Sequence, residues 1–354
     1  MKKLIALLLA LICLLSALPA ALAAQEGPQP IPVVAPEGRT PTPPGIHHYL
    51  LICLDKWDYT LRNQWVKDIW DETYDTNTDG LILVTVNEND GSVKLTSFIR
   101  DMLIQRPDGE YGRINNFLYA NPTTQTGGWA WVNKKSDAEA FQALVDTINS
   151  HFDLNIEKFI VMDFRQVQNI IDAVGGVDVE ITNREARKLF LYPIGASATS
   201  PSLQEGSRGG VYHMTGYAAV IYMRIRKIET KAYLHADGTT HSDNQDYGRT
   251  YRDRMVLTAL ADSLKDVTLD RATALLDVIL SNTVYTNMTT RDFEEALTLA
   301  MALRGAPVQH IRMPADGTKY WESGYAGMAT KEIDYLGNRA VLHDFLFGFT
   351  VVDE

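Results

Sequence analysis

The stretch GLILVTVNENDGSVKLTSFIRD, residues 80–101, decides the fold. It contains two runs of apolar and β-branched residues, Gly80–Val86 and Ser92–Phe98, separated by the polar segment Asn87–Gly91. An Asp-Gly pair between two such runs is typical of a hairpin turn. We therefore expect two adjacent antiparallel strands at this point of the chain.

Strands and helices alternate around this hairpin. Short apolar runs predict strands, and apolar residues at helical spacing predict a helix between them. Asp163 and Gln166 have the spacing of a capping box that starts a helix, and the Gly175-Gly176 pair ends it. We therefore interpret the chain from Lys158 to Ile181 as a strand–helix–strand crossover. The expected elements are the strands Tyr49–Leu54, Lys158–Phe164 and Val177–Ile181 and the helix Ala138–Ile148.

The C-terminal third of the chain is predicted to be mainly helical. Strands that are enclosed by helices on both faces predict an α/β fold, arranged as a three-layer α/β/α sandwich. The expected helices are Thr250–Lys265, Leu269–Leu280, Thr290–Arg304 and Lys331–Phe347.

The composition is that of an ordinary globular protein. The chain has 354 residues, of which 45% are hydrophobic and 22% are charged, and its formal net charge is −11. These values exclude a fibrous or disordered protein, and the negative charge argues against general binding to nucleic acid or to anionic membranes. The two cysteines are Cys13 and Cys53, and Cys13 lies in the N-terminal segment, so the mature chain holds no internal disulfide.

The N-terminal segment predicts export. Lys2 and Lys3 precede the apolar run Leu4–Leu15, and Ala21–Ala24 supplies the small residues of a cleavage site. The apolar run is shorter than the roughly 20 residues of a spanning helix, so we expect a cleaved signal peptide over residues 1–24 rather than a retained anchor. The proline-rich residues 25–46 predict an extended linker, and residues 47–354 are expected to form one domain.

One acidic turn resembles a metal site without fitting it. Residues Asp75–Gly80 match the first half of an EF-hand calcium loop. The twelfth position of that loop is Val86, where a bidentate glutamate is required, and a strand rather than a helix follows. We therefore interpret Asp75, Asn77 and Asp79 as a polar turn before a buried strand. The sequence also lacks the common motifs of nucleotide-binding, serine-hydrolase, zinc-protease and thiol-redox sites.

Arginines lie in unusual places in the second half of the chain. An alternating, β-type stretch over Tyr222–Arg226 puts Arg224 and Arg226 on one face, where two neighbouring guanidiniums require an anion. Residues 246–254 bring three more arginines to an expected helix start, where Thr250 and Asp253 have capping-box spacing. Arginine side chains and the free amides of a helix start suit phosphate or pyrophosphate. Surface ion pairs are the alternative for any single arginine.

A further charged group follows the hairpin directly. Arg100 and Asp101 stand at the end of a buried strand, which is where α/β folds bind ligands. Arg113 and Asn115 come shortly after. A local ion pair between Arg100 and Asp101 and a helix cap at Asn115 are the structural alternatives, and the residues alone leave both open.

In their order along the chain, these motifs resemble those of the LytR-CpsA-Psr proteins of bacterial cell envelopes. Each motif alone is weak, whereas six in order behind an export signal are specific. The resemblance covers about residues 49–265 and implies the α/β/α fold of that family, with a central mixed sheet. The motifs are Thr78-Asp79-Gly80, Arg100-Asp101, Arg113–Tyr119, Gly175–Val179, Tyr222-x-Arg224-x-Arg226 and Asp246-x-Gly248-Arg249-Thr250-x-Arg252.

The resemblance implies a cell wall phosphotransferase. Such an enzyme moves a glycopolymer, for example teichoic acid or capsule, from an undecaprenyl-pyrophosphate carrier to peptidoglycan through a phosphodiester bond. It works at the outer face of the cytoplasmic membrane, with a divalent metal that is usually Mg²⁺, and with no nucleic acid partner. Guanidiniums and a metal are suited to this reaction because they stabilise the negative charge that spreads over the phosphoryl oxygens.

The resemblance also assigns roles to individual residues. Arg100, Asp101 and Asp79 are expected to be catalytic, with Asp101 positioning Arg100 and with Asp79 or Asp101 accepting the proton of the attacking hydroxyl. Substrate-binding residues are expected at Arg224, Arg226 and Arg249 for the pyrophosphate and at Arg113 and Asn115 near the sugar. The metal ligands are expected to be Asp79 and Asp55. The apolar faces around Phe141, Leu144, Ile170 and Ile171 are candidates for the walls of the prenyl groove, with an ordinary core as the alternative.

Two departures from the family pattern bear on activity. Asn77 stands where the family commonly has an arginine, and Asp253 stands where a glutamine usually follows the second arginine of its motif. One cation fewer and one anion more at a pyrophosphate site favour weaker binding or altered specificity. The alternatives are therefore a non-catalytic envelope protein that binds polyprenyl phosphates or regulates wall assembly, and a polyprenyl-pyrophosphate hydrolase.

Overall fold

A computed structural model of the chain describes residues 39–54, 77–105, 111–117, 137–191, 206, 208–225, 233–234, 240–241, 246–281, 283, 285–325 and 328–348. The expected signal peptide, residues 1–24, lies outside the described residues, as do Asp55 and Arg226. Among the described residues, no helix has the length and apolar composition needed to cross a membrane.

The central sheet is mixed and has the predicted hairpin in its middle. Its strand order is β11-β6-β1-β2-β3-β12. β2 and β3 pair in antiparallel register from Asn87 opposite Ser92 to Ile82 opposite Ser97, so the hairpin is confirmed. β1 runs parallel to β6, and β3 runs parallel to β12. The strands are β1 (Ile46–Leu54), β2 (Thr78–Asn87), β3 (Ser92–Phe98), β6 (Lys158–Asp163), β11 (Tyr285–Thr286) and β12 (Val308–Met313).

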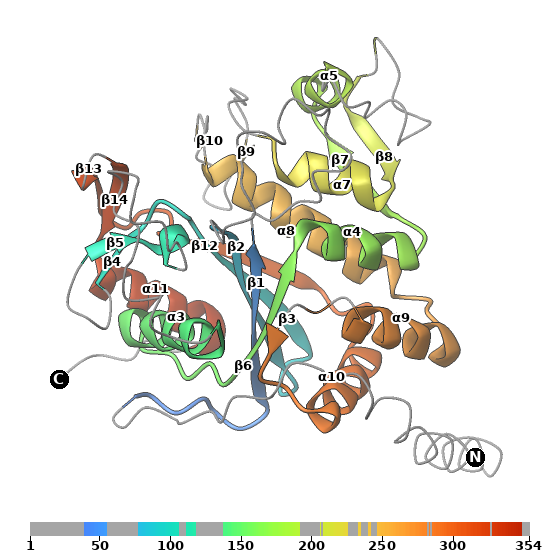
Figure 1. The fold of residues 1–354 in the computed structure, drawn as a ribbon, viewed down its shortest axis with the longest axis horizontal. Helices are drawn as coiled ribbons and strands as arrows, with labels where there is room; N and C mark the ends of the chain where they lie inside the picture. The colour runs from blue at the N-terminus through green and yellow to red at the C-terminus, as the bar shows by residue number, and fades with distance from the viewer. Residues whose placement is uncertain are drawn as a thin grey trace.

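The two faces of the sheet are covered differently, as the alternation along β1 shows. Leu50, Ile52 and Leu54 are buried in a core with α3 (Asp137–Phe152) and α11 (Tyr335–Phe347). Tyr49 and Leu51 point to the opposite face, where α8 (Asp246–Ser263), α9 (Leu269–Ser281) and α10 (Thr290–Ala302) lie. Helices therefore flank the sheet on both sides, which confirms the α/β/α sandwich (Figure 1).

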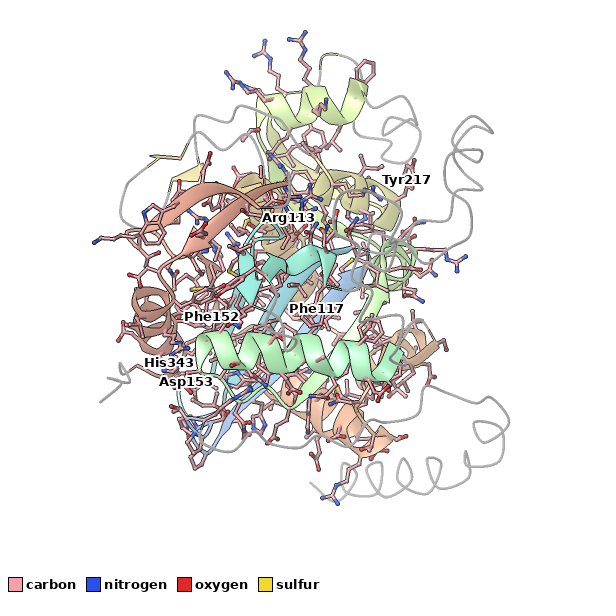
Figure 2. All side chains as sticks on the ribbon, turned by 60° about the vertical axis from the view of Figure 1, so that its left-hand side comes forward. Arg113, Phe117, Phe152, Asp153, Tyr217 and His343 are labelled. Atoms are coloured by element: carbon pink, nitrogen blue, oxygen red, sulfur yellow. The ribbon has the colours of Figure 1, made fainter. Side chains whose placement is uncertain are left out.

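α3 and α11 hold the first face together and also tie down the start of the domain. Figure 2 looks onto α3, with Phe152 and Asp153 at its C-terminal end beside His343 of α11. His343 Nε2 lies 3.0 Å from the carbonyl oxygen of Phe152. Thr40 Oγ1 donates a hydrogen bond of 2.6 Å to Asp153, so the last residues of the segment predicted as a linker contact this end of α3.

A second hydrophobic cluster lies beside the sheet. It includes α4 (Phe164–Ala173), α5 (Asn183–Leu191), α7 (Gly216–Met223) and the strand pair β7 (Val177–Ile181) and β8 (Gly210–Met214). These elements pack against α8, which adds Val256 and Ala259 to the cluster (Figure 1).

The predicted crossover from β6 to β7 is wrong in one respect. Asp163 and Gln166 form the expected capping box, and α4 follows β6 as predicted. β7, however, pairs with β8 in a separate two-stranded sheet rather than with the central sheet. The left-handed backbone of Gly175 and Gly176, with φ of +94° and +99°, redirects the chain there. The alternation of buried and exposed residues along β7 also fits a half-exposed strand rather than a central parallel one.

Helix starts differ from the sequence predictions at two places. α8 begins at Asp246, so Thr250 lies inside the helix and its hydroxyl donates to the carbonyl of Tyr247 instead of capping the helix start. α11 begins after its cap Asp334, because Lys331 belongs to a strand. The remaining short elements are β4 (Leu103–Gln105), β5 (Tyr111–Arg113), η3 (Ile114–Asn116), β9 (Tyr233–Leu234), β10 (Thr240–His241), β13 (Tyr320–Tyr325) and β14 (Met328–Ile333).

The second cluster is fastened to α8 by a buried ion pair. Arg252 Nε lies 2.7 Å from Glu185 Oε1 of α5, and the two side chains are 1% and 2% exposed. Arg252 Nη1 also donates to the carbonyl of Ile225, just beyond α7. This arginine therefore joins α5, α7 and α8.

Truncating this arginine is expected to destabilise the protein strongly. Arg252→Ala leaves the Glu185 carboxylate buried without its oppositely charged partner, which typically costs about 3–5 kcal/mol. The free energy of unfolding in urea measures this loss. Arg291→Ala is the control, because Arg291 and its partner Glu295 are exposed, and such pairs contribute about 0–1 kcal/mol. Equal stability of the two variants would show that the buried pair does not hold α5 in place.

Candidate functional site

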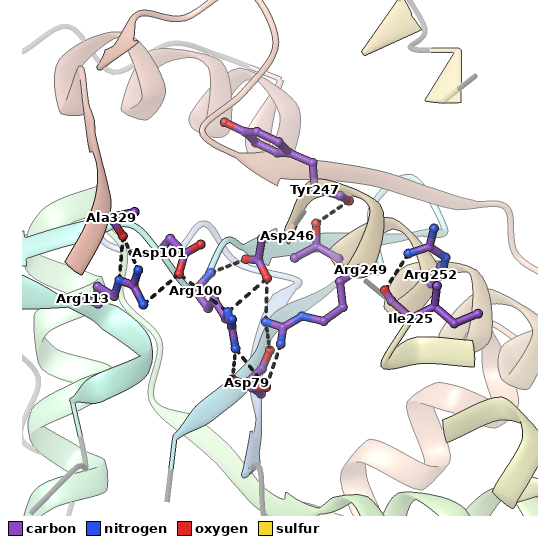
Figure 3. A network of polar contacts seen from close by, with 11 residues as sticks. Asp79, Arg100, Asp101, Arg113, Ile225, Asp246, Tyr247, Arg249, Arg252 and Ala329 are labelled. Atoms are coloured by element: carbon purple, nitrogen blue, oxygen red, sulfur yellow. Dashed lines mark hydrogen bonds and ion pairs between the residues drawn. The ribbon is translucent and has the colours of Figure 1, made fainter. Parts of the chain in front are cut away.

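Charged side chains gather at one edge of the central sheet. Because β2 runs antiparallel to β1 and β3, its first residues meet the last residues of those strands. Asp79 lies at the start of β2, and Arg100 and Asp101 follow the end of β3. Asp246 and Arg249 reach the same edge from the first turn of α8 (Figure 3). The carboxyl ends of strands in an α/β sheet are where ligands usually bind.

Asp79 is the centre of this cluster. Its Oδ1 accepts a hydrogen bond of 2.9 Å from Arg100 Nη1, and its Oδ2 accepts one of 2.8 Å from Arg249 Nη1. Arg249 Nη2 also donates to the backbone carbonyl of Asp79 at 2.6 Å. Burial alone would raise the pKa of Asp79, but the guanidiniums of Arg249 and Arg100 outweigh it and lower that pKa to about 2.

Asp246 joins the same two arginines from the other side. Its Oδ2 accepts a hydrogen bond of 2.6 Å from the backbone N–H of Arg100, and its Oδ1 lies 2.8 Å from Arg249 Nη2. Burial raises the pKa of Asp246, although the two guanidiniums oppose this. Asp246 was not among the site residues predicted from the sequence. The signal was its spacing of three residues from Arg249, which places both side chains on one face of a helix.

Asp101 and Arg113 extend the cluster away from α8. Asp101 Oδ1 lies 3.6 Å from Arg100 Nε and 3.4 Å from Arg113 Nη1, so the expected pairing of Arg100 with Asp101 exists. Arg113 Nε donates to the carbonyl of Ala329 in β14 at 2.8 Å. Asn115 is buried inside η3 rather than capping it, and its N–H donates to the carbonyl of Arg100. The structure therefore brings Arg113 and Asn115 next to Arg100.

Arg224 does not lie on a strand. Tyr222 and Met223 belong to α7, and Arg224 caps the end of that helix, so the predicted β-type stretch is wrong. The run Gly216–Met223 is apolar on all sides and wholly buried, which suits a helix inside a core, and Thr215 caps its start. The Arg224 guanidinium lies over the ring of Phe164 at 4.7 Å, and its charge contributes to the low pKa of Asp79. Its predicted neighbour Arg226 lies outside the described residues.

The described carboxylates do not by themselves form a metal site. Both oxygens of Asp79 accept hydrogen bonds from arginine, and Asp55, the other expected ligand, is not among the described residues. Within the described part of the chain, no group of three or more histidine, cysteine, aspartate or glutamate residues is arranged to hold a metal ion. The requirement for Mg²⁺ therefore stays a prediction.

An apolar cavity opens directly from the charged cluster. It has a volume of about 220 Å³ and lies between β1, β6, α4 and α8, with Asp79, Arg249 and Asp253 in its wall. A second cavity of about 360 Å³ lies between the sheet and α8, α9 and α10. Both cavities are lined by Leu51, Ile160 and Ile279, so they adjoin each other along the sheet. Arginine side chains at one end of a long apolar space suit a ligand with a phosphate head and a hydrocarbon tail.

Half of the candidate groove residues line this space. Ile170 and Ile171 of α4 lie in the wall of the smaller cavity. Phe141 and Leu144 do not, because α3 covers the opposite face of the sheet and buries both side chains in the core there. For Phe141 and Leu144 the alternative, an ordinary core, is therefore confirmed.

Comparison with known proteins gives one consistent result. The model of the LytR_cpsA_psr family matches residues 58–340. Biofilm regulatory protein A of Streptococcus mutans is 25% identical over 271 residues, which are 75% of this chain and 58% of that protein. The polyisoprenyl-teichoic acid–peptidoglycan teichoic acid transferase TagV of Bacillus subtilis is 25% identical over 187 residues, 53% of this chain and 39% of that protein. The chain thus matches less than two thirds of the length of either relative.

Solved structures show the same fold at lower identity. TagV of B. subtilis superposes with a TM-score of 0.57 at 19% identity and covers 88% of this chain and 100% of that one. The LytR-CPS2A-psr family protein YwtF (TagT) with bound octaprenyl pyrophosphate lipid superposes with a TM-score of 0.54 at 15% identity and covers 87% of this chain and 93% of that one.

The Asp79 cluster predicts a pH-dependent contribution to stability. A carboxyl group with a lowered pKa in the folded state stabilises the protein above its ordinary pKa of 3.8, and this stabilisation is lost as the pH falls through about 2. The difference in unfolding free energy between wild type and Asp79→Asn should therefore shrink by roughly 2 kcal/mol between about pH 5 and about pH 2. Urea titrations at each pH measure it.

Asp277→Asn is the matched control for this measurement, because Asp277 is exposed on α9. The same titrations on this variant show how much of the change follows from the loss of any exposed carboxylate. A difference in unfolding free energy between wild type and Asp79→Asn that stays the same down to about pH 2 would contradict the ion-paired state of Asp79.

Proposed function

The chain belongs to the LytR-CpsA-Psr family, and from that premise we propose that it is a cell wall phosphotransferase. Its donor is a glycopolymer on a polyprenyl-pyrophosphate carrier, its acceptor is peptidoglycan, and the bond that it forms is a phosphodiester. The observation that carries the proposal is the contact between the arginine cluster and the apolar cavity, which share Asp79 and Arg249.

The relatives support this proposal through their names. TagV and several proteins named TagU are described as polyisoprenyl-teichoic acid–peptidoglycan teichoic acid transferases. The TagT structures are described with octaprenyl pyrophosphate or with LI-WTA bound. These descriptions belong to the relatives, and the particular glycopolymer used by this chain is part of the proposal.

The cavity and the arginines bind different parts of the carrier lipid. The hydrocarbon chain enters the space between the sheet and α8, where the odd-numbered residues of β1 and the apolar side chains of α4 and α8 replace water around it. The pyrophosphate stays at the sheet edge, within reach of Arg100, Arg249 and Arg224. We propose that Arg226, which is not among the described residues, also binds the pyrophosphate.

Transfer then requires a displacement at the phosphorus next to the glycopolymer. A hydroxyl group of a peptidoglycan sugar forms the new P–O bond, the bridging P–O bond breaks, and polyprenyl phosphate leaves. The guanidiniums stabilise charge on the phosphoryl oxygens as the bridging bond breaks. Arg113 and Asn115, which lie next to Arg100, are proposed to contact the sugar side.

Asp101 is the better candidate for the base that takes the hydroxyl proton. Both oxygens of Asp79 already accept hydrogen bonds from arginine, and its pKa of about 2 makes it a poor proton acceptor. Asp101 Oδ1 is buried and accepts no hydrogen bond from the described residues, although Arg100 and Arg113 lie nearby. Its carboxylate therefore has acceptor capacity left for a substrate hydroxyl.

The setting of the reaction is also part of the proposal. The N-terminal segment predicts export, so we place the protein outside the cytoplasm, at the outer face of the cytoplasmic membrane where lipid-linked polymers meet peptidoglycan. A divalent metal is proposed from the resemblance alone, and no step above depends on it. Loss of transfer in EDTA that is restored by MgCl₂ would support the metal.

The proposed reaction predicts a specific product. Purified protein given a polyprenyl-pyrophosphate-linked oligosaccharide and peptidoglycan fragments should form a phosphodiester-linked adduct that mass spectrometry detects. Arg100→Ala should slow adduct formation by about 10²- to 10³-fold, the usual cost of removing one group that stabilises transition-state charge. Arg291→Ala, which alters an exposed arginine on α10, is the control and should keep the wild-type rate.

Two other outcomes of this assay would favour other functions. Release of free phosphorylated sugar with or without acceptor, and no adduct, would indicate a hydrolase. Binding of the lipid with no consumption at all would indicate a non-catalytic envelope protein.

A separate prediction concerns the apolar cavity. Leu260 of α8 lines the smaller cavity, so Leu260→Trp should occupy space needed by a long hydrocarbon chain. Binding of a long polyprenyl diphosphate, followed by calorimetry in detergent, should weaken at least about tenfold, or roughly 1.4 kcal/mol. Binding of inorganic pyrophosphate should not change. Leu336→Trp is the control, because Leu336 is 64% exposed on α11. Equal lipid binding by both variants would show that the hydrocarbon chain does not occupy this cavity.

A further inference from the structure

Asp253 is a buried carboxyl group in the wall of the smaller cavity. It lies on α8 one turn after Arg249 and is 5% exposed. Farther along the same helix, Val256, Leu257 and Leu260 continue the wall. At 1.5 Å per residue, Asp253 stands about 6 Å deeper along the helix than Arg249. It therefore occupies the boundary between the edge that carries the arginine cluster and the apolar space.

No described residue forms an ion pair or a hydrogen bond with the Asp253 carboxyl group. Arg249 and Arg254 attract it, while Asp246 and Asp79 repel it. Burial is the largest influence, and together these raise the pKa of Asp253 to about 7. On the other sides of the cavity stand Cys53 of β1, Met162 of β6, Phe164 and Val167 of α4 and Met223 of α7.

We infer that Asp253 is a proton-dependent contact for the phosphate nearest the lipid chain. As a carboxylic acid it donates a hydrogen bond to an oxygen of that phosphate, and as a carboxylate it repels the same oxygen. This inference rests on the proposed function, because it assumes that a polyprenyl pyrophosphate occupies the cavity. The position of Asp253 supports the inference, because a polyprenyl diphosphate that binds at Arg249 with its hydrocarbon chain directed along α8 passes Asp253.

The residue type matters at this position. An amide side chain donates a hydrogen bond at every pH, whereas a carboxyl group does so only when it is protonated. An aspartate here makes capture of the lipid depend on the acidity of the surroundings. Asp253→Asn and Asp253→Gln place a permanent donor at the same point and should remove this dependence.

Binding measured against pH tests the inference. The probe is a polyprenyl diphosphate in detergent micelles, titrated calorimetrically into wild type, Asp253→Asn and Asp253→Gln between about pH 6 and about pH 8. The ligand titrates too, but its own contribution cancels in the ratio of the wild-type and variant dissociation constants. Because the pKa of Asp253 is about 7, the wild-type dissociation constant divided by the variant one should rise about tenfold from about pH 6 to about pH 8. Asp277→Asn, an exposed change on α9, should follow wild type throughout.

A second measurement reports on Asp253 without any ligand. A carboxyl group with a raised pKa loses stabilisation as the pH rises from about 4 to about 7, so Asp253→Asn should gain in melting temperature over wild type across that range. The infrared band of a protonated carboxyl should also fade in wild type near pH 7 and be missing from Asp253→Asn. A wild type that lacks both signatures would overturn the inference.

The possible results separate this inference from the proposed function. Lipid binding with the same pH dependence in wild type and Asp253→Asn overturns the inference and leaves the proposed function standing. No lipid binding by either protein at any pH overturns both. The same pH-dependent rise in this ratio of dissociation constants with inorganic pyrophosphate supports contact of Asp253 with phosphate in general. A rise seen only with the polyprenyl ligand supports contact with the phosphate that carries the hydrocarbon chain.

Discussion

A buried carboxylate held between two guanidiniums determines how the parts of this protein meet. Asp79 is 21 residues from Arg100 and 170 residues from Arg249, and it accepts a hydrogen bond from each. The first contact joins two neighbouring strands at the edge of the sheet, and the second joins that edge to α8. Because α8 also carries Arg252, which fastens α5, the second hydrophobic cluster is positioned relative to the sheet through the same helix.

This constraint places charge and apolar space side by side. The helices α3 and α11 fill one face of the sheet with core side chains, whereas the face toward α8, α9 and α10 keeps two adjoining cavities. The arginine cluster stands at one end of them, with its guanidiniums balanced by Asp79, Asp101 and Asp246. These ion pairs hold the arginines in place, and the diphosphate of the proposed substrate would compete with the carboxylates for them.

The elements that were predicted correctly have local signals. The β2–β3 hairpin follows from Asp90-Gly91 between two apolar runs, and the start of α4 follows from the Asp163 capping box. The errors and the alternatives left open concern choices that neighbouring residues do not decide. The five residues Tyr222–Arg226 alternate like a strand, yet the buried surroundings of α7 make the first two helical. Phe141 and Leu144 have helical spacing, but the spacing does not say which face of the sheet α3 covers.

The candidate site was predictable only in part, for a similar reason. Asp79, Arg100 and Arg249 were found through the order of motifs, and the structure brings them together. Asp246 and the cavity position of Asp253 were missed because both depend on which side of α8 faces the sheet, which tertiary packing decides.

A crystal structure of the protein with a polyprenyl pyrophosphate bound tests the proposed site most directly. We expect the diphosphate to contact Arg100 and Arg249 and the hydrocarbon chain to lie along Leu51 and Ile160, between the sheet and α8 and α9. A diphosphate bound away from this edge, or a chain on the side of α3 and α11, would contradict it.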